Sequence, residues 1–168
     1  MVIVGSHRDE SDTLAFTEKI LGDIPHKLVN LRKVRISPYC YSGKYREEDQ
    51  FDYMAGLMAI YNPIVFATPV YWYSMSGIMK DYFDRITDLL TINKPYGRKL
   101  RGKTIYVISV GSDRKLPDGF EMPFRNTAKY LGMKYGGITY KSTKINYEED
   151  YFKLNKKLQR STRMYNRR

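Results

Sequence analysis

The stretch Val65-Phe66-Ala67-Thr68-Pro69-Val70-Tyr71-Trp72-Tyr73-Ser74-Met75-Ser76-Gly77-Ile78-Met79-Lys80 determines the expected fold of this chain. It begins inside an apolar run, 64–67, that is typical of a buried strand. Pro69 has no N–H to donate, so we expect it to end the pairing of that strand. Three aromatic residues follow, and after Gly77 the apolar residues recur at helical spacing. The order is therefore strand, aromatic loop, helix.

This order predicts a ligand site, because ligands of open α/β sheets bind at the carboxyl ends of the strands. The flat side chains of Tyr71, Trp72 and Tyr73 favour a flat ligand there. The alternative is that these aromatics belong to the core or to an oligomer contact, since aromatic residues are enriched at interfaces.

Length and composition predict one domain over residues 1–168 in the cytoplasm. No apolar run approaches the roughly 18 residues of a membrane helix, and the pattern of a secretory signal is absent. Cys40 is the only cysteine, so an internal disulfide and an all-cysteine metal site are excluded. We expect no bound metal and no membrane partner.

The net charge of +11 favours anionic partners such as nucleotides, nucleic acid or a membrane surface. Part of it is local, because residues 141–168 hold nine Lys and Arg against three acidic residues. We interpret residues 148–168 as a solvated basic helix and tail. Nucleic acid is not the expected partner, because the aromatic signatures of RNA-binding strands are absent.

The loop after the first apolar run has the composition of a phosphate site. Hydroxyl groups of Ser6, Ser11 and Thr13 can donate hydrogen bonds, and Arg8 adds a charged fork of donors. A helical pattern follows from Leu14, and the start of a helix is an anion site. The alternative is an ordinary helix cap at Ser11 or Asp12. The acidic residues in this loop oppose phosphate binding unless some of them point to solvent.

Strands and helices alternate along the whole chain, which predicts a parallel sheet with helices on both faces. Five strands suit the flavodoxin-like order 2-1-3-4-5 in a three-layer sandwich. Strands are expected at 1–5, 26–31, 64–67, 104–110 and 135–143, and helices at 14–21, 51–61, 77–91, 123–131 and 148–158, with a turn at 93–97.

Residues 97–104 match the pattern G-x-x-x-x-G-K-T of a nucleotide-binding P-loop. That motif needs a strand before it and a helix after it. Here a turn precedes the pattern and a strand follows it, so we do not interpret it as a P-loop.

Three stretches resemble the NAD(P)H-dependent FMN reductases of the flavodoxin-like superfamily, in the branch that includes the iron–sulfur flavoproteins. Gly5-Ser6-His7-Arg8 with Ser11-Asp12-Thr13 is similar to the phosphate loop of that family. Residues 68–77 resemble its flavin loop, and residues 120–133 resemble its late helix.

The resemblance implies an oxidoreductase with FMN as cofactor and NAD(P)H as co-substrate, and no side chain need act as a catalytic base or nucleophile. It also implies a homodimer or homotetramer in which a neighbouring chain helps to wall the flavin. The phosphate is expected on the first loop and the flavin ring against the aromatic loop, with a third loop opposite. The predicted cofactor-binding residues are Ser6, Arg8, Ser11, Thr13, Thr68, Pro69, Val70, Tyr71, Trp72, Tyr73, Ser74, Gly111 and Ser112.

The chain departs from the family pattern in two places. Asp12 stands where the family usually has an uncharged Asn, which weakens the phosphate site. Relatives often carry cysteines that hold an iron–sulfur cluster in the loop 37–45, but here Tyr39, Ser42 and Tyr45 occupy those positions. A cluster needs thiolates, so none is expected.

Three functions agree with these observations. The first is an FMN-dependent oxidoreductase that passes reducing equivalents from NAD(P)H to a small acceptor such as a flavin or quinone. The second is an FMN-binding electron carrier without NAD(P)H turnover of its own. The third is a basic protein that binds nucleic acid or another anion and no flavin.

Overall fold

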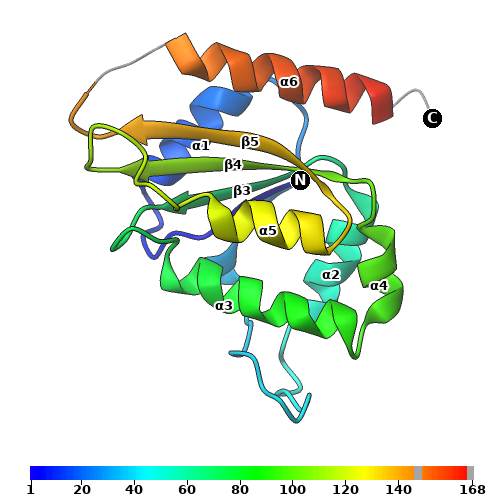
Figure 1. Cartoon of the computed structure of the whole chain (residues 1–168). Coiled ribbons are helices and arrows are strands. Elements are labelled where there is room, and N and C mark those ends of the chain that lie inside the picture. Colours follow the sequence, from blue (N-terminus) through cyan, green and yellow to red (C-terminus); the bar gives the residue numbers. More distant parts are fainter. Residues whose placement is uncertain (146–148, 166–168) are drawn as a thin grey trace.

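A computed structural model describes residues 1–145 and 149–165, with side chains described to residue 145 and from 153 to 161. One parallel sheet of five strands runs through it, in the order β2-β1-β3-β4-β5 (Figure 1). The predicted flavodoxin-like order is therefore confirmed. The strands are β1 (Val2–Val4), β2 (Leu28–Asn30), β3 (Ile64–Pro69), β4 (Thr104–Gly111) and β5 (Lys134–Ser142).

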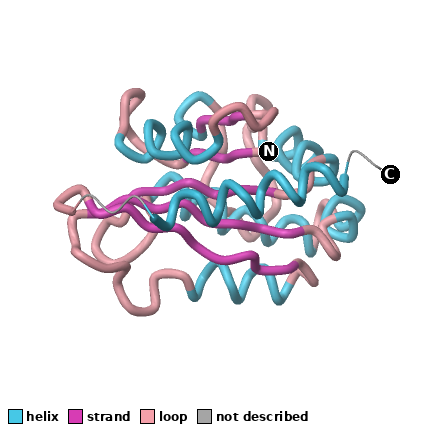
Figure 2. Tube along the Cα trace, turned by 90° about the horizontal axis from the view of Figure 1, so that it is seen from above, coloured by secondary structure: helices cyan, strands magenta, loops and turns pink. Residues whose placement is uncertain are grey.

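Helices cover both faces of the sheet (Figures 1 and 2). They are α1 (Asp12–Leu21), α2 (Phe51–Ile60), α3 (Gly77–Arg85), α4 (Lys94–Lys99), α5 (Met122–Tyr130) and α6 (Glu149–Tyr165), with the 3₁₀ turns η1 (Leu31–Lys33) and η2 (Ile86–Leu90). Figure 1 shows α1 and α6 on one side of the sheet and α2, α3 and α5 on the other.

The two faces of the sheet build two separate cores, because successive strand side chains point to opposite faces. Ile3 and Phe66 pack with α2, α3 and α5, whereas Val4 and Ala67 pack with α1 and α6. Among the described side chains of α6, Leu154 and Leu158 are buried in the second core. The basic helix is thus docked through an apolar stripe.

Several expected elements differ from the structure. The second strand, expected at 26–31, spans Leu28–Asn30, and Leu31 begins η1. β3 continues through Pro69, which still pairs with Val110 of β4; its nitrogen faces β1, which has already ended at Val4, so no ladder bond is lost there. The helix from Gly77 turns into η2 after Arg85. The turn at 93–97 begins α4, where Pro95 suits the first turn of a helix. The last helix runs to Tyr165, while residue 148 lies outside the described part.

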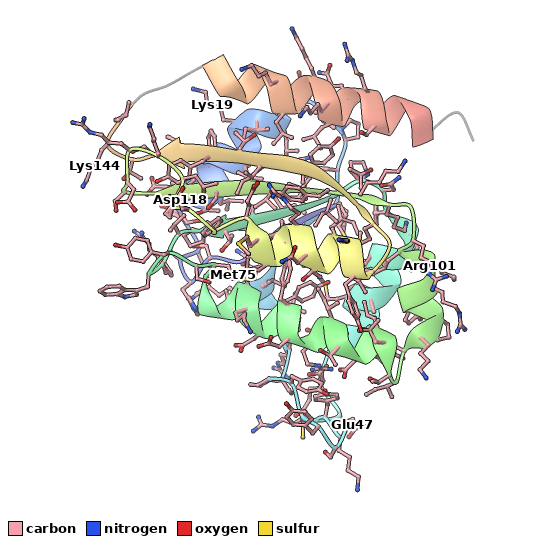
Figure 3. All side chains as sticks on the ribbon, viewed as in Figure 1. Lys19, Glu47, Met75, Arg101, Asp118 and Lys144 are labelled. Carbon is pink, nitrogen blue, oxygen red and sulfur yellow. The ribbon has the colours of Figure 1, made fainter. Side chains whose placement is uncertain are left out.

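A buried arginine anchors the loop between η1 and α2. The Arg85 guanidinium is 2.7 Å from Asp49 and 2.8 Å from Asp88, and it stacks 3.4 Å from the ring centre of Tyr45. It also donates to the Ser37 carbonyl oxygen at 2.9 Å. This loop projects away from the body of the molecule, with Glu47 near its tip (Figure 3). A long loop is therefore held by a few buried charges at its base.

Candidate functional site

The loop between β1 and α1 presents the predicted phosphate donors. Ser6 and Thr13 are buried, and the Ser11 hydroxyl caps α1 by accepting from the Leu14 N–H at 3.1 Å. In the described part of the chain, the N–H groups of Asp12 and Thr13 have no hydrogen-bond partner. The first turn of α1 therefore points free donors and the positive end of the helix dipole at the same place.

An ion pair on this loop neutralises the charge of Asp9, one of the acidic side chains that would oppose a phosphate. Arg32 donates two hydrogen bonds to the Asp9 carboxylate, at 3.0 and 2.6 Å, and one to the His7 carbonyl oxygen at 3.4 Å. The hydrogen-bonded Arg32 guanidinium lowers the pKa of Asp9, so this carboxylate stays ionised and paired. The positive charge of Arg8 has no such partner among the described residues.

Three loops meet over the carboxyl ends of the strands and enclose a cavity of about 380 Å³. The first follows β1, the second follows β3 and the third follows β4, as the parallel sheet requires. The cavity is lined by Ser6, Arg8, Ser11, Asp12, Thr13, Pro69, Val70, Tyr71, Val110, Gly111, Ser112 and Thr143. Its size lies in the range of about 300–1,000 Å³ that ligand pockets span.

Gly111 keeps the third loop close to the second. A Cβ atom at this position would lie 2.8 Å from the Tyr140 hydroxyl and 3.1 Å from the Val70 Cβ. The Tyr140 hydroxyl donates to the Asp113 carbonyl oxygen at 2.8 Å, which holds the loop after β4 against β5. Glycine is therefore required here by a close approach, not by an unusual backbone angle.

Buried hydroxyl groups beneath the cavity connect the strand ends. The Ser76 hydroxyl donates to the Gly5 carbonyl oxygen at 2.6 Å and caps α3 by accepting from the Met79 N–H. The Thr68 hydroxyl accepts from the Ser76 N–H at 3.1 Å. The Ser109 hydroxyl donates to the Thr68 carbonyl oxygen at 2.9 Å. These bonds set the relative positions of the three loops.

The aromatic loop is a tight turn at the rim of the cavity. Tyr71 and Ser74 exchange two backbone hydrogen bonds, at 2.9 and 3.0 Å, and the φ angles of Trp72 and Tyr73 are +48° and +63°. Two successive positive φ angles define a type I′ geometry that Asn and Gly normally adopt. The turn exposes 94% of Trp72 and 68% of Tyr73.

The structure brings nine of the predicted residues together around the cavity. They are Ser6, Arg8, Ser11, Thr13, Pro69, Val70, Tyr71, Gly111 and Ser112. The other four do not line it: Thr68 is buried beneath it, and Trp72, Tyr73 and Ser74 lie in the exposed turn at its rim. The predicted contact of these four with a flavin stays a prediction.

Three further residues line the cavity that were not among the predicted ones. From the sequence, Asp12 is expected only to oppose the phosphate or to cap the helix, and no pattern points to Val110 or Thr143. Val110 and Thr143 lie at the ends of β4 and β5, so the rule that sites form at carboxyl strand ends could have found both. Nothing in the residue types themselves marked them.

With this geometry established, comparison with known proteins decides the family. The model of the NADPH-dependent FMN reductase family matches residues 1–141. The chain belongs to this family. Family membership makes the protein an oxidoreductase, with FMN as its cofactor.

Individual relatives agree with this assignment. A Bacillus subtilis protein named as an NAD(P)H-dependent FMN-containing oxidoreductase, YwqN, is 27% identical over 147 residues, which is 81% of this chain and 80% of YwqN. Among solved structures, the Trp repressor binding protein of Bacillus subtilis is 24% identical, with a TM-score of 0.68 over 96% of this chain and 97% of that one. The general stress protein 14 of Treponema denticola, solved with FMN, is 17% identical, with a TM-score of 0.60 over 98% and 93%. Both structures support the fold.

The residues around the cavity fit the family's cofactor. A phosphate monoester needs several uncharged donors and one or two cations, which Ser6, Thr13 and Arg8 provide beside the free N–H groups of α1. Asp12 is the one acidic residue in the lining, and its exposed side chain opposes the phosphate. The apolar part of the lining lies in the other two loops, at Pro69, Val70 and Val110.

Proposed function

We propose that this protein passes reducing equivalents from NAD(P)H, through FMN in the cavity at the strand ends, to a small flat acceptor such as a quinone or free flavin. The observation that carries the proposal is the meeting of three loops around one cavity, with phosphate donors at one end and an exposed aromatic turn at the other.

Each loop has its own task in this proposal. Ser6, Arg8 and Thr13 would hold the phosphate, together with the free N–H groups at the capped start of α1. Pro69 to Tyr71 would hold the flavin ring from one loop and Gly111 with Ser112 from another, since both sets line the cavity. Bound FMN supplies the acceptance and onward transfer of a hydride, and the chain supplies binding, orientation and exclusion of water.

The exposed turn is suited to receive the second substrate. Trp72 and Tyr73 present flat side chains to solvent at the edge of the cavity, held there by a backbone geometry that is unfavourable for both residues. Aromatic faces bind other flat rings through stacking. A quinone or a free flavin therefore suits this rim better than a globular protein acceptor.

Steady-state kinetics tests the proposal. Protein reconstituted with FMN is expected to oxidise NADH or NADPH with multiple turnovers in the presence of a soluble quinone or of excess FMN. The variant Trp72→Ala is expected to raise the KM for the quinone several-fold. FMN binding without multiple turnovers, with either nucleotide, would instead identify an electron carrier that depends on a separate reductase.

A further inference from the structure

A second cavity lies at the other edge of the sheet, between α4, η2 and the end of α5. Its volume is about 480 Å³, somewhat larger than that of the cavity at the strand ends. It is lined by Leu89, Leu90, Lys94, Gly97, Arg98, Arg101, Lys129, Tyr130, Leu131 and Gly132. Arg101 and Gly132 lie just before the first residues of β4 and β5, so this is the amino-terminal edge of the sheet.

The two cavities lie at opposite ends of the strands, so the reactive part of one ligand cannot reach both. β4 contains 8 residues, which places its two ends about 23 Å apart at the usual rise per residue. Figure 3 shows Arg101 at one end of the molecule and Asp118 and Lys144 at the other. A molecule bound at the second cavity therefore does not present a nicotinamide to the flavin.

The charge around the second cavity has one sign. The lining residues that carry a charge at neutral pH are all cations, Lys94, Arg98, Arg101 and Lys129. Within the described residues none of these side chains makes an ion pair or hydrogen bond, whereas Arg32, Lys80 and Arg125 each pair with a nearby carboxylate. Like charges at (i, i+4) spacing, such as Lys94 and Arg98, repel one another in a helix. The cluster is thus an unbalanced charge that an anion would stabilise.

The cavity also has an aromatic and apolar part. Tyr130 is 77% exposed at the end of α5, and Leu90 is 40% exposed at the end of η2. Arg101 passes close over Gly132, since a Cβ atom at Gly132 would lie 3.3 Å from the Arg101 Cγ. Arginine binds phosphate through two parallel N–H bonds and stacks on aromatic faces, so both features suit a ligand that is part ring and part phosphate.

We propose that this second cavity binds a nucleotide with two or more phosphate groups, with the base against Tyr130 and the phosphates among the four cations. The four cations line one cavity together with a single exposed aromatic ring, that of Tyr130, and this favours a mononucleotide over a nucleic-acid strand that would need several stacking platforms. The proposal is independent of the flavin reaction, because it uses none of the residues at the strand ends.

Binding of ADP to the FMN-saturated protein, followed by isothermal titration calorimetry at low salt, tests the proposal. Saturation with FMN keeps ADP away from the strand-end cavity. The variant Arg98→Glu with Arg101→Glu reverses two charges in the second cavity. The matched control, Lys156→Glu with Arg160→Glu, makes the same change of charge on the exposed face of α6. Retained FMN affinity and an unchanged unfolding midpoint show that both variants are folded.

The expected result is saturable ADP binding that the Arg98–Arg101 variant weakens at least tenfold and the control weakens less than threefold. Adenosine is expected to bind at least tenfold more weakly than ADP. Tyr130→Leu should weaken the binding of ADP several-fold and leave the binding of inorganic tripolyphosphate nearly unaffected.

Several outcomes would overturn the proposal. One is equal weakening by the two double variants, because that would reduce the effect to net charge. Another is the absence of saturable ADP binding to the FMN-saturated protein. A third is tight binding of an oligothymidylate that depends on Arg98 and Arg101 while ADP does not bind, which would make the cavity part of a nucleic-acid surface.

Discussion

Two arginines of this chain show how surroundings decide what a residue does. Arg85 is buried and its charge is balanced by Asp49 and Asp88, so it stabilises the fold. Arg8 is exposed beside the strand-end cavity and has no carboxylate partner among the described residues. Its charge is available to a ligand, and a phosphate is the ligand that its neighbours suit.

Arg8→Ala is therefore expected to weaken the binding of FMN and to leave the binding of riboflavin, which lacks the phosphate, nearly unchanged. A hydrogen bond to a charged group contributes about 1.5–3 kcal/mol, so the Kd for FMN should rise about ten- to a hundredfold. Titration of flavin fluorescence measures both ligands. Lys33→Ala is the matched control, because it removes a nearby exposed charge that does not line the cavity. Equal losses for FMN and riboflavin would refute the phosphate assignment.

The positive φ angles of Trp72 and Tyr73 are expected to lower the stability of the fold while they keep both side chains exposed at the site. Non-glycine residues at positive φ are strained by about 1–3 kcal/mol each. Replacing them by Asn and Gly, the preferred type I′ pair, should raise the free energy of unfolding by about 1 kcal/mol. The same variant should raise the KM for a quinone.

Urea denaturation measures the stability of this double variant, and Trp72→Phe serves as its control because it keeps both the aromatic ring and the strain. A double variant that is less stable than the parent chain would show that the turn is not strained in solution.

At the scale of elements, the loop before α2 depends on a single buried cation. Arg85→Met would leave the Asp49 and Asp88 carboxylates buried without their partner, which typically costs about 3–5 kcal/mol. The same change should release residues 37–49, so limited proteolysis at Lys44 and Arg46 should become faster. Lys80→Met, which breaks an exposed pair with Asp84, is the control and should cost no more than about 0.5 kcal/mol.

The Asp49 carboxyl determines how the stability of Arg85→Met depends on pH. Burial alone would raise its pKa, but hydrogen bonds from Arg85 and from the backbone N–H groups of Ser37 and Phe51 outweigh burial and lower it. A lowered pKa stabilises the fold above the unfolded value of about 4, and this contribution is lost as the pH falls through the folded value. Without Arg85 the shift in the Asp49 pKa changes from downward to upward, because burial then favours the protonated carboxyl. The difference in unfolding free energy between the two chains should therefore shrink from pH 7 to pH 4.5; a constant difference would contradict the role of the ion pair.

At the scale of the whole molecule, exposed aromatic surface predicts self-association. Tyr41 is 96% exposed, and Trp72 with Tyr73 add a second aromatic patch. Tyr and Trp are enriched in interface cores, while the charge of +11 on each chain opposes association at low salt. Closed symmetric association needs only local complementarity, so we expect a homodimer or homotetramer with the flavin site near a subunit boundary.

Light scattering at moderate salt, with FMN bound, is the measurement for this prediction. Trp72→Glu is expected to shift the mass toward that of the monomer. Tyr53→Glu changes another exposed tyrosine, on α2, and should leave the mass unchanged. A monomer mass that persists as the protein concentration rises would contradict the predicted self-association.

None of the helices in the described part of the chain has both the length and the apolar character needed to cross a membrane. Two features of the described surface concentrate positive charge. These are the exposed face of α6, whose other face packs Leu154 and Leu158 on the sheet, and the second cavity at the amino-terminal edge. The expectation that the chain carries no iron–sulfur cluster rests on its single cysteine, Cys40.

The amino-acid sequence by itself determined the alternation of strands and helices, the parallel sheet and its order, and the phosphate-type loop that leads to the flavin-dependent family. These features are local: apolar periodicity, hydroxyl groups before a helix, and glycine or proline at element ends are all readable over a few residues. Nine of the thirteen predicted site residues share one cavity because the carboxyl ends of parallel strands must meet at one edge.

Only the tertiary structure decided the rest, because the contacts concerned join residues far apart in the chain. Arg85 lies 36 positions from Asp49, and Ser76 lies 71 positions from the Gly5 carbonyl that it bonds. No local pattern distinguishes a buried, paired arginine from an exposed one, or shows that Thr68 lies beneath the cavity while Tyr71 lines it. The second cavity likewise depends on long-range packing. Arg98 comes from α4 and Tyr130 ends α5, and only the packing of these helices brings the two residues together.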